Sequence, residues 1–205
     1  MKLIGPWFSG YTRRVGVTLN LLGISFEHLP YHAYEQQDLI RPYSPMVKVP
    51  ALALDDGTIL YDSGSIIEYL HEEVGPERAL LAPSGVDRRD ALQFIGIASA
   101  IYGKLSNIFD ESLRPPEHQI ASIVESYRQQ ALAGFQMIES RAGSGWLVGD
   151  ALSQADVMVA ISYQTASLAV MPDVVHPVAF PRLARLAARA MEMEEFSSTL
   201  PFRQK

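Results

Sequence analysis

The 205-residue chain is predicted to fold as a small α/β domain followed by an all-helical domain. Short apolar runs alternate with helical patterns over residues 1–77, which predicts the α/β domain. Turn-forming residues interrupt this pattern at 75–86. The helical period dominates the residues that follow. We therefore place the domains at 1–77 and 86–205.

The first part of the α/β domain has a strand–helix–strand pattern. Residues 2–5 (KLIG) predict a short strand. Residues 12–23 (TRRVGVTLNLLG) predict a helix that begins at a capping residue, Thr12, and stops at Gly23. Residues 24–30 alternate apolar and polar side chains, which is typical of a half-buried strand. The segment that follows is irregular or weakly helical.

The second part predicts a hairpin and a helix. The runs PALAL and TILY flank Asp55-Asp56-Gly57, and an Asp-Gly pair between short apolar runs is a strong hairpin signal. In the next segment, Ser65 and Glu68 have the spacing of a capping box. The helix that follows has one apolar face, formed by Ile66, Ile67, Leu70 and Val74.

The helical domain is predicted from apolar stripes. The first stripe consists of Phe94, Ile97, Ile101, Leu105 and Ile108. A second helix follows Pro115-Pro116, and its stripe consists of Ile120, Ile123, Val124, Tyr127 and Ala131. Ser153 and Asp156 form a capping box before a helix that runs to about residue 169, and residues 181–193 predict the last helix.

Charge and composition disfavour several classes of protein. The formal net charge is −6 and neither part of the chain is basic, which argues against a nucleic-acid binder. The chain has no cysteine, so a cysteine nucleophile and a thiolate metal site are excluded. The histidines show no metal-binding spacing, and no apolar run is long enough to span a membrane. The N-terminal residues do not resemble a signal peptide, so a cytoplasmic location is expected.

Two features of residues 46–70 (MVKVPALALDDGTILYDSGSIIEYL) indicate the edge of a binding site. Pro50 removes a main-chain donor from a segment that otherwise resembles a strand. Asp62 and Ser63 lie between the next strand and a helix. Each feature also has an ordinary interpretation, Pro50 as an edge-strand proline and the Asp-Ser pair as a helix cap.

Three stretches in this order resemble the glutathione S-transferase family. WFSGYTRRVGVTLNLLGISFE is similar to the first βαβ unit of members with a catalytic serine, because Ser9 lies five residues before Arg14-Val15. Residues 44–70 resemble the glutathione-recognition half, and GDALSQADVMVAI resembles the capping box of the helical domain. The resemblance covers nearly the whole chain. It is strongest to bacterial and plant tau-like serine enzymes, and the Ser-Ser-Cys motif of the zeta isomerases is absent.

This resemblance implies a fold and a ligand. The first domain would be thioredoxin-like with a mixed four-stranded sheet, and the second a helical bundle. Glutathione would be the co-substrate, with no metal, and the protein would be a homodimer. The peptide bond before Pro50 would be cis, so that the main chain of Val49 pairs with the cysteinyl part of glutathione. Asp62 and Ser63 would hold the γ-glutamyl end and Lys48 the glycyl carboxylate.

The resemblance also implies a chemical role for Ser9. The Ser9 hydroxyl would donate a hydrogen bond to the glutathione thiolate, which then attacks a small hydrophobic electrophile. A pocket for that electrophile is expected between the domains, with Tyr11, Tyr102 and Phe109 as candidate lining residues. An isomerase, a dehalogenase or an ether-cleaving enzyme would use the same thiolate.

Other interpretations of these residues stay open. A non-catalytic interaction module of the same fold is the second functional hypothesis. Ser9 would then be a loop serine or a helix cap, Lys48 a solvated side chain, and the three aromatic residues part of the packing. A serine hydrolase has no support, since neither a histidine nor an acid is spaced locally to activate Ser9.

Overall fold

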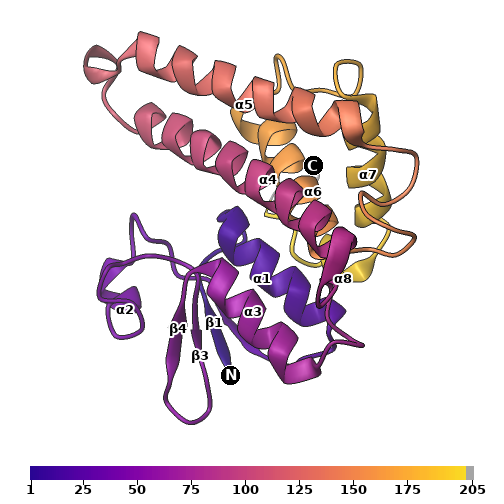
Figure 1. The fold of residues 1–205 in the computed structure, drawn as a ribbon. Coiled ribbons are helices and arrows are strands. Elements are labelled where there is room, and N and C mark those ends of the chain that lie inside the picture. The colour runs from indigo at the N-terminus through magenta and orange to yellow at the C-terminus, as the bar shows by residue number, and fades with distance from the viewer. Residues whose placement is uncertain (202–205) are drawn as a thin grey trace. The chain divides into compact units, whose positions relative to one another are not determined.

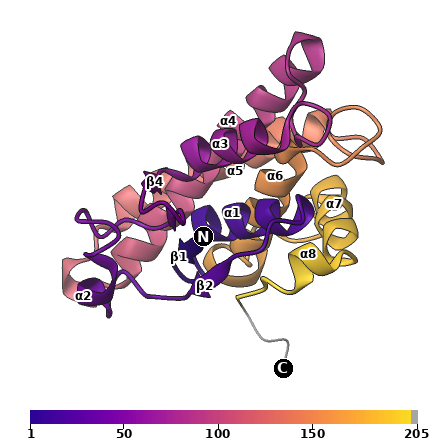
Figure 2. The same ribbon diagram turned by 90° about the horizontal axis from the view of Figure 1, so that it is seen from below.

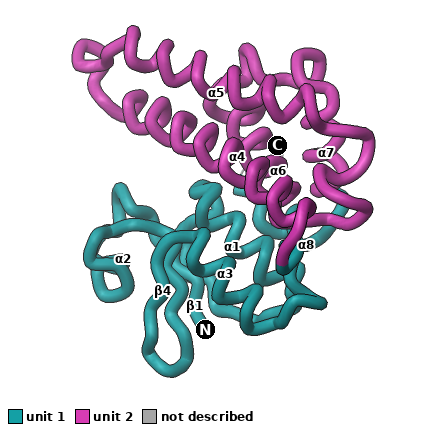
Figure 3. The backbone as a smooth tube through the Cα atoms, in the orientation of Figure 1, with its two compact units in different colours: residues 1–83, 191–205 teal, residues 84–190 magenta. Residues whose placement is uncertain are grey.

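The computed structural model describes residues 1–201, which divide into two compact units (Figure 3). Unit 1 comprises Met1–Pro83 together with the segment that begins at Met191, and unit 2 comprises Ser84–Ala190. The sequence pattern assigns every residue after 86 to the helical domain. The C-terminal segment instead packs with the α/β unit.

A mixed four-stranded sheet forms the centre of unit 1 (Figure 1), as predicted. Its strands are β1 (Lys2–Ile4), β2 (Glu27–Leu29), β3 (Ala51–Ala53) and β4 (Ile59–Tyr61), in the order β2-β1-β3-β4. The first pair is parallel, with Leu3 opposite His28, and the other two pairs are antiparallel.

Helices cover both faces of this sheet because successive strand residues point to opposite sides. Leu3 packs with α1 (Gly10–Leu21) and α3 (Ser63–Val74) in a core that also contains Leu52. The next residue, Ile4, faces the other side and packs with Ile40 of the short helix α2 (Gln37–Ile40). The sheet therefore lies between α1 and α3 on one face and α2 on the other.

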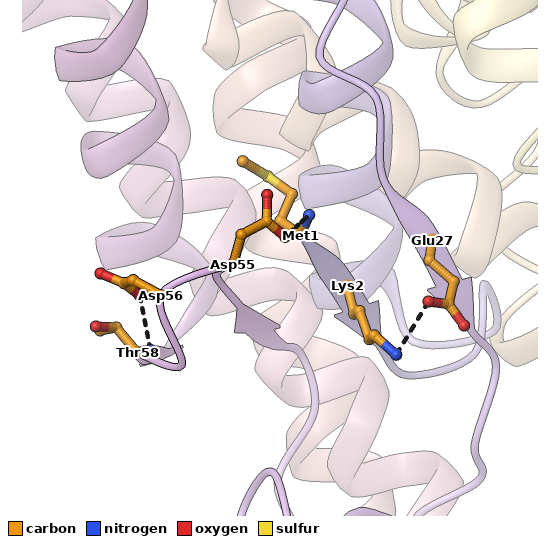
Figure 4. A network of polar contacts seen from close by, with 6 residues as sticks. All are labelled: Met1, Lys2, Glu27, Asp55, Asp56 and Thr58. Carbon is orange, nitrogen blue, oxygen red and sulfur yellow. Dashed lines mark hydrogen bonds and ion pairs between the residues drawn. The ribbon is translucent and has the colours of Figure 1, made fainter.

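The β3–β4 hairpin has the turn that the Asp-Gly pair predicts. The Leu54 N–H donates to the Thr58 carbonyl at 2.8 Å, and Gly57 has a φ of 91°. The Asp56 carboxylate accepts the Thr58 N–H at 2.8 Å (Figure 4).

Two ion pairs near this turn tie neighbouring strands together. Figure 4 shows the Met1 amino group beside Asp55, at 2.6 Å, and Lys2 beside Glu27, at 3.1 Å. The Asp55 side chain and both members of the Lys2–Glu27 pair are exposed. Such pairs contribute little to stability.

Two predicted helix starts are wrong, and both errors concern capping. The sequence pattern predicts Thr12 as the first cap, but Ser9 caps α1 through the Thr12 N–H. Likewise, Ser65 does not cap α3, because the Asp62 carboxylate three residues earlier accepts the Gly64 N–H at 2.7 Å. In both cases an earlier oxygen satisfies the orphan donors, so the helix begins sooner.

Unit 2 is helical. Its elements are α4 (Gly85–Ser112), the 3-10 turn η1 (Pro116–His118), α5 (Ala121–Arg141), α6 (Gln154–Thr165), the π-helical turn η2 (Ala166–Val170) and α7 (Pro181–Met191, whose last residue belongs to unit 1). Helix α5 approaches α4 closely at Gly134, where a Cβ atom would lie 2.5 Å from the Ile101 side chain. Every residue of α6 from 154 to 164 is buried, so this helix forms the centre of the unit.

The predicted apolar stripes of α4 and α5 are buried to different extents. On α4, Phe94, Ile101, Leu105 and Ile108 are buried as expected. The α5 stripe is wrong in its first half, since Ile120 and Ile123 are exposed. The buried face of α5 begins at Ala131 and continues through Gly134, Phe135 and Ile138. Periodicity identified the helix but not the part of it that is covered.

The C-terminal segment packs on α1 within unit 1. The short helix α8 (Glu194–Ser197) lies beside α1 in both views (Figures 1 and 2). Arg13 is 2% exposed and donates from Nε to the Thr199 hydroxyl at 3.1 Å. Phe196 is fully buried. These contacts join the two ends of the chain into one unit.

Candidate functional site

Ser9 lies in the loop that joins β1 to α1, at the N-terminus of the helix. Its hydroxyl oxygen accepts the Thr12 N–H at 3.3 Å, and its own N–H donates to the Pro6 carbonyl at 3.0 Å. Capping uses a lone pair of the hydroxyl and leaves its proton for another acceptor. Ser9 is half-buried. The hydroxyl and the positive end of the helix dipole thus favour a negative charge at the same place.

The loop before Ser9 lies against the segment that contains Val49. Gly5 has a φ of 130°, and a Cβ atom there would lie 2.4 Å from the Thr12 hydroxyl and 2.8 Å from the Val49 Cβ. Only a glycine allows this close approach. The structure therefore brings the Ser9 loop and Val49 together, although they are far apart in the sequence.

The main chain of Val49 is open to a ligand. The Val49–Pro50 peptide bond is cis. The pairing of β3 with β1 begins at Ala51, and within residues 1–201 no hydrogen bond involves the N–H or the C=O of Val49. An extended peptide could therefore pair with this residue as it would with a strand edge. Lys48 is exposed beside it.

Asp62 and Ser63 lie where β4 ends and α3 begins. Asp62 has a φ of 65°, a conformation that non-glycine residues adopt rarely and that often marks functional sites. Its carboxylate caps α3 and is exposed to solvent. Ser63 is 3% exposed, at the first position of the helix. This arrangement joins a carboxylate, a hydroxyl and a helix N-terminus.

A buried cation, Arg14, lies beneath this helix start. It is 6% exposed, and its terminal nitrogen would lie 3.4 Å from a Cβ at Gly64. Burial lowers the Arg14 pKa, while the nearby charges of Asp62 and Tyr11 act to raise it. In the sequence, Arg14 served only to define the spacing from Ser9 to the Arg14-Val15 pair. No apolar context distinguishes it in the sequence, because Thr12 and Arg13 directly precede it.

Tyr11 belongs to the same group of side chains as Arg14 and Asp62. Burial raises the pKa of its hydroxyl. The charge of Arg14 lowers this pKa, and the charge of Asp62 raises it. These shifts agree with a group of three ionisable side chains close to one another. Tyr11 is half-buried, which suits a residue that lines a site.

Tyr102 and Phe109 lie on α4, in unit 2. Tyr102 is 5% exposed and belongs to the core of that unit, while Phe109 is half-buried. A packing role therefore accounts for Tyr102. The contact of these two residues with an electrophile stays a prediction.

A pocket of about 500 Å³ opens elsewhere in unit 1. It is lined by Asn20, Gly23, Ile24, Ser25, Phe26, Glu194, Glu195 and Ser198. These residues surround the C-terminal end of α1, and the 12-residue helix places them roughly 18 Å from its N-terminal end. The pocket is therefore separate from Ser9.

Within residues 1–201, no group of three or more histidine, aspartate or glutamate side chains could hold a metal ion. No helix in that part of the chain combines the length and apolar character needed to cross a membrane.

The aromatic ring of Trp7 stacks on the imidazole of His28 near Ser9. The ring centroids are 3.7 Å apart and the planes differ by 18°. The Nε2 atom of His28 lies 2.8 Å from the Gly5 carbonyl, so it carries the proton and donates. Burial lowers the His28 pKa, and the bond to Gly5 opposes this effect.

The His28 pKa predicts a pH dependence of stability. The folded protein disfavours protonation, so below the ordinary value of 6.5 the unfolded chain binds the proton first. We expect this part of the stability to be complete above 6.5 and to be lost as the pH falls through the lowered pKa. Urea unfolding at several pH values measures the slope, and His28→Gln should remove part of it. An identical slope in the variant would contradict the assignment.

Comparisons with known proteins identify the first domain and the fold. Residues 3–78 match the model of the glutathione S-transferase N-terminal domain. A glutathione S-transferase from Methylobacterium radiotolerans, solved with glutathione sulfonate, superposes with a TM-score of 0.91 over 100% of this chain and 96% of that one, at 24% identity. Unit 1 thus contains a glutathione S-transferase N-terminal domain. Over nearly its whole length the chain is also similar to a glutathione S-transferase from Triticum aestivum, at 27% identity over 98% of this chain and 93% of that one.

Two further relatives are isomerases by name. A probable maleylacetoacetate isomerase from Drosophila melanogaster is 29% identical over 98% of this chain and 82% of its own. A solved maleyl pyruvate isomerase, described as a bacterial zeta-class glutathione S-transferase, is 26% identical with a TM-score of 0.81, covering 100% and 98%. The tau-like resemblance is not confirmed, because the relatives include zeta proteins.

Proposed function

We propose that this protein is a glutathione transferase that binds glutathione in unit 1 and activates its thiol through Ser9. The observation that carries this proposal is the Ser9 hydroxyl, which caps α1 with its oxygen and keeps its proton for an acceptor. The loop that bears it packs against Val49, whose main chain is open. A cysteinyl residue paired with Val49 would bring its sulfur toward Ser9.

The thiol must be ionised to react. A free thiol has a pKa of about 8.5, so only about 3% is thiolate at pH 7. Lowering this pKa by two units requires about 2.7 kcal/mol. A hydroxyl donor to a charged acceptor contributes about 1.5–3 kcal/mol, and a helix N-terminus roughly 0.3–1 kcal/mol. Ser9 and the start of α1 together contribute about 1.8–4 kcal/mol, a range that includes the amount required.

The rest of the tripeptide has matching charges. The α-carboxylate of the γ-glutamyl residue fits the Ser63 hydroxyl and the N–H groups that begin α3, with the Arg14 cation beneath them. The ammonium group fits the Asp62 carboxylate. Lys48, exposed beside Val49, would pair with the glycyl carboxylate. The electrophile would be small and hydrophobic, with Tyr11 beside the sulfur.

The names of the relatives favour a second candidate, a glutathione-dependent isomerase. Addition of the Ser9-held thiolate to an activated double bond would turn it into a single bond. Rotation and loss of the thiolate would then give the other isomer and regenerate glutathione. The activation step is the same as in conjugation. Analysis of the product distinguishes the two, since only conjugation consumes glutathione.

Calorimetric titration with glutathione near pH 7, in two buffers of different ionisation enthalpy, tests the proposal. We expect saturable binding with release of a substantial fraction of a proton, because the bound thiol ionises. Ser63→Ala should weaken binding, whereas Ser65→Ala, an exposed serine of the same helix, should not. The absence of binding at millimolar glutathione would contradict the proposal and favour a non-catalytic interaction module.

We also infer a homodimer. Among the residues that the structure describes, unit 1 exposes four large apolar side chains: Tyr34, Leu39, Met46 and Tyr61. Of these, Met46 is the most exposed, at 65%. A second copy of the chain could cover such side chains, because exposed apolar area is buried at protein interfaces. Light scattering should give twice the monomer mass, and Met46→Glu should lower it. A cytoplasmic location, where a glutathione pool is present, stays a prediction.

A further inference from the structure

Trp7 and His28 form a stacked pair that fills the space between α1 and the sheet. The pair comes from two elements, the loop before Ser9 and strand β2. On one side, Trp7 lies against α1, because a Cβ atom at Gly16 would lie 2.4 Å from its ring. On the other side, it lies 3.7 Å from the His28 ring, measured between centroids. Trp7 is therefore held between α1 and His28.

His28 also holds the main chain of the same loop. Its Nε2–H donates to the Gly5 carbonyl at 2.8 Å. The Gly5 N–H donates to the carbonyl of Leu29, the next residue of β2, at 2.9 Å. Both polar groups of Gly5 are thus bonded to β2. One histidine fixes the loop at Gly5 through a hydrogen bond and at Trp7 through its ring.

These two fixed residues determine where the Ser9 hydroxyl lies. Pro6, between them, has a restricted φ, and its carbonyl accepts the Ser9 N–H at 3.0 Å. The path from His28 to Ser9 therefore contains Gly5, Trp7 and one turn. Helix α1 itself is capped by Ser9 and packs through the core residues Val15 and Leu19.

We propose that His28 is a positioning residue for Ser9, and that its stacking on Trp7 and its bond to Gly5 hold the hydroxyl where it meets the glutathione sulfur. The effect of His28 on the glutathione thiol rests on the proposed function, whereas its effect on the position of Ser9 does not. A hydroxyl displaced by even 1 Å would lose much of its hydrogen bond to the thiolate. The affinity for glutathione would change little, because Val49, Asp62 and Ser63 lie outside the pair.

The first test requires no glutathione. Hydrogen exchange of the Ser9 amide reports the turn that ends at Ser9, since this amide donates to Pro6. We expect His28→Ala to accelerate its exchange by up to about tenfold, the equivalent of one lost hydrogen bond. The Leu52 amide, in the centre of the sheet, should be unaffected. Unchanged exchange at Ser9 would overturn the proposal whatever the protein catalyses.

The second test measures the pKa of the bound thiol, from the ultraviolet absorbance of the thiolate as a function of pH. His28→Ala should raise this pKa by about one unit, with a Kd for glutathione within about twofold of the wild type. His28→Gln keeps a donor and His28→Phe keeps a ring, so each should restore part of the shift. His32→Ala, an exposed histidine in the same segment, is the matched control and should change nothing.

The outcomes of the second test separate the two proposals. Suppose that the wild type binds and ionises glutathione, and that the pKa of the bound thiol is the same in His28→Gln and His28→Phe. Positioning by His28 is then overturned, while the transferase proposal stands. If the wild type does not ionise bound glutathione, the transferase proposal fails, and the Ser9 exchange rate then decides the positioning role alone. The two conservative variants keep the test valid where His28→Ala does not fold.

Discussion

Replacing Ser9 with alanine should lower kcat by roughly 10- to 150-fold, with little change in the affinity for glutathione. The range corresponds to the loss of one hydrogen bond to a charged acceptor, about 1.5–3 kcal/mol. Affinity should persist because Val49, Asp62 and Ser63 provide the other contacts. Steady-state kinetics with a reactive aryl halide, together with calorimetry, measures both quantities.

Two further variants separate catalysis from capping, since Ser9 also caps α1. Loss of the cap alone should reduce stability by about 0.5–2 kcal/mol. Ser9→Asp keeps a capping oxygen but donates no proton near pH 7, so it should be stable and inactive. Ser9→Thr keeps both properties and should retain activity. Full turnover in Ser9→Ala would remove the hydroxyl from the mechanism.

Asp156→Ala should be strongly destabilising, by about 3–5 kcal/mol. The Asp156 carboxylate accepts three hydrogen bonds inside unit 2, from the Ser153 N–H at 2.8 Å, the Ser153 hydroxyl at 2.7 Å and the Leu147 N–H at 2.8 Å. Asp156 is fully buried. Alanine would leave two main-chain donors and one hydroxyl without this acceptor, at about 1–3 kcal/mol for each buried group. Urea unfolding measures the change.

The controls for Asp156 isolate the capping box. Asp150→Ala removes an exposed aspartate from the preceding loop and should change stability by less than about 0.5 kcal/mol. Ser153→Ala should have an intermediate effect of about 1 kcal/mol. The double variant should be less destabilised than the sum of the two single changes, because the residues share their bonds. Wild-type stability in Asp156→Ala would show that water replaces the carboxylate.

Local patterns predicted the elements whose causes lie close together in the chain. The Asp55-Asp56-Gly57 turn forms the expected hairpin, because its geometry depends on residues in direct sequence. The capping box of Ser153 and Asp156 is present for the same reason. The order of strands and helices in unit 1 agrees with the prediction, since alternation and helical periodicity are local properties.

Choices between nearby residues were less predictable. Ser9 and Asp62 cap α1 and α3 in place of Thr12 and Ser65. All four residue types are good caps, so local preference does not decide among them. The direction in which the chain enters each helix decides, and that direction depends on the sheet.

Contacts between distant segments account for what the sequence alone does not reveal. The proximity of Arg14 to Asp62, the stacking of Trp7 on His28 and the docking of Phe196 beside α1 each join residues from different elements. The exposed Ile120 and Ile123 show the converse, an apolar stripe that no neighbouring helix covers. The amino-acid order specifies helix, strand and turn through interactions a few residues apart. Burial, charge pairing and the position of the Ser9 hydroxyl depend on how the sheet and helices of unit 1 pack.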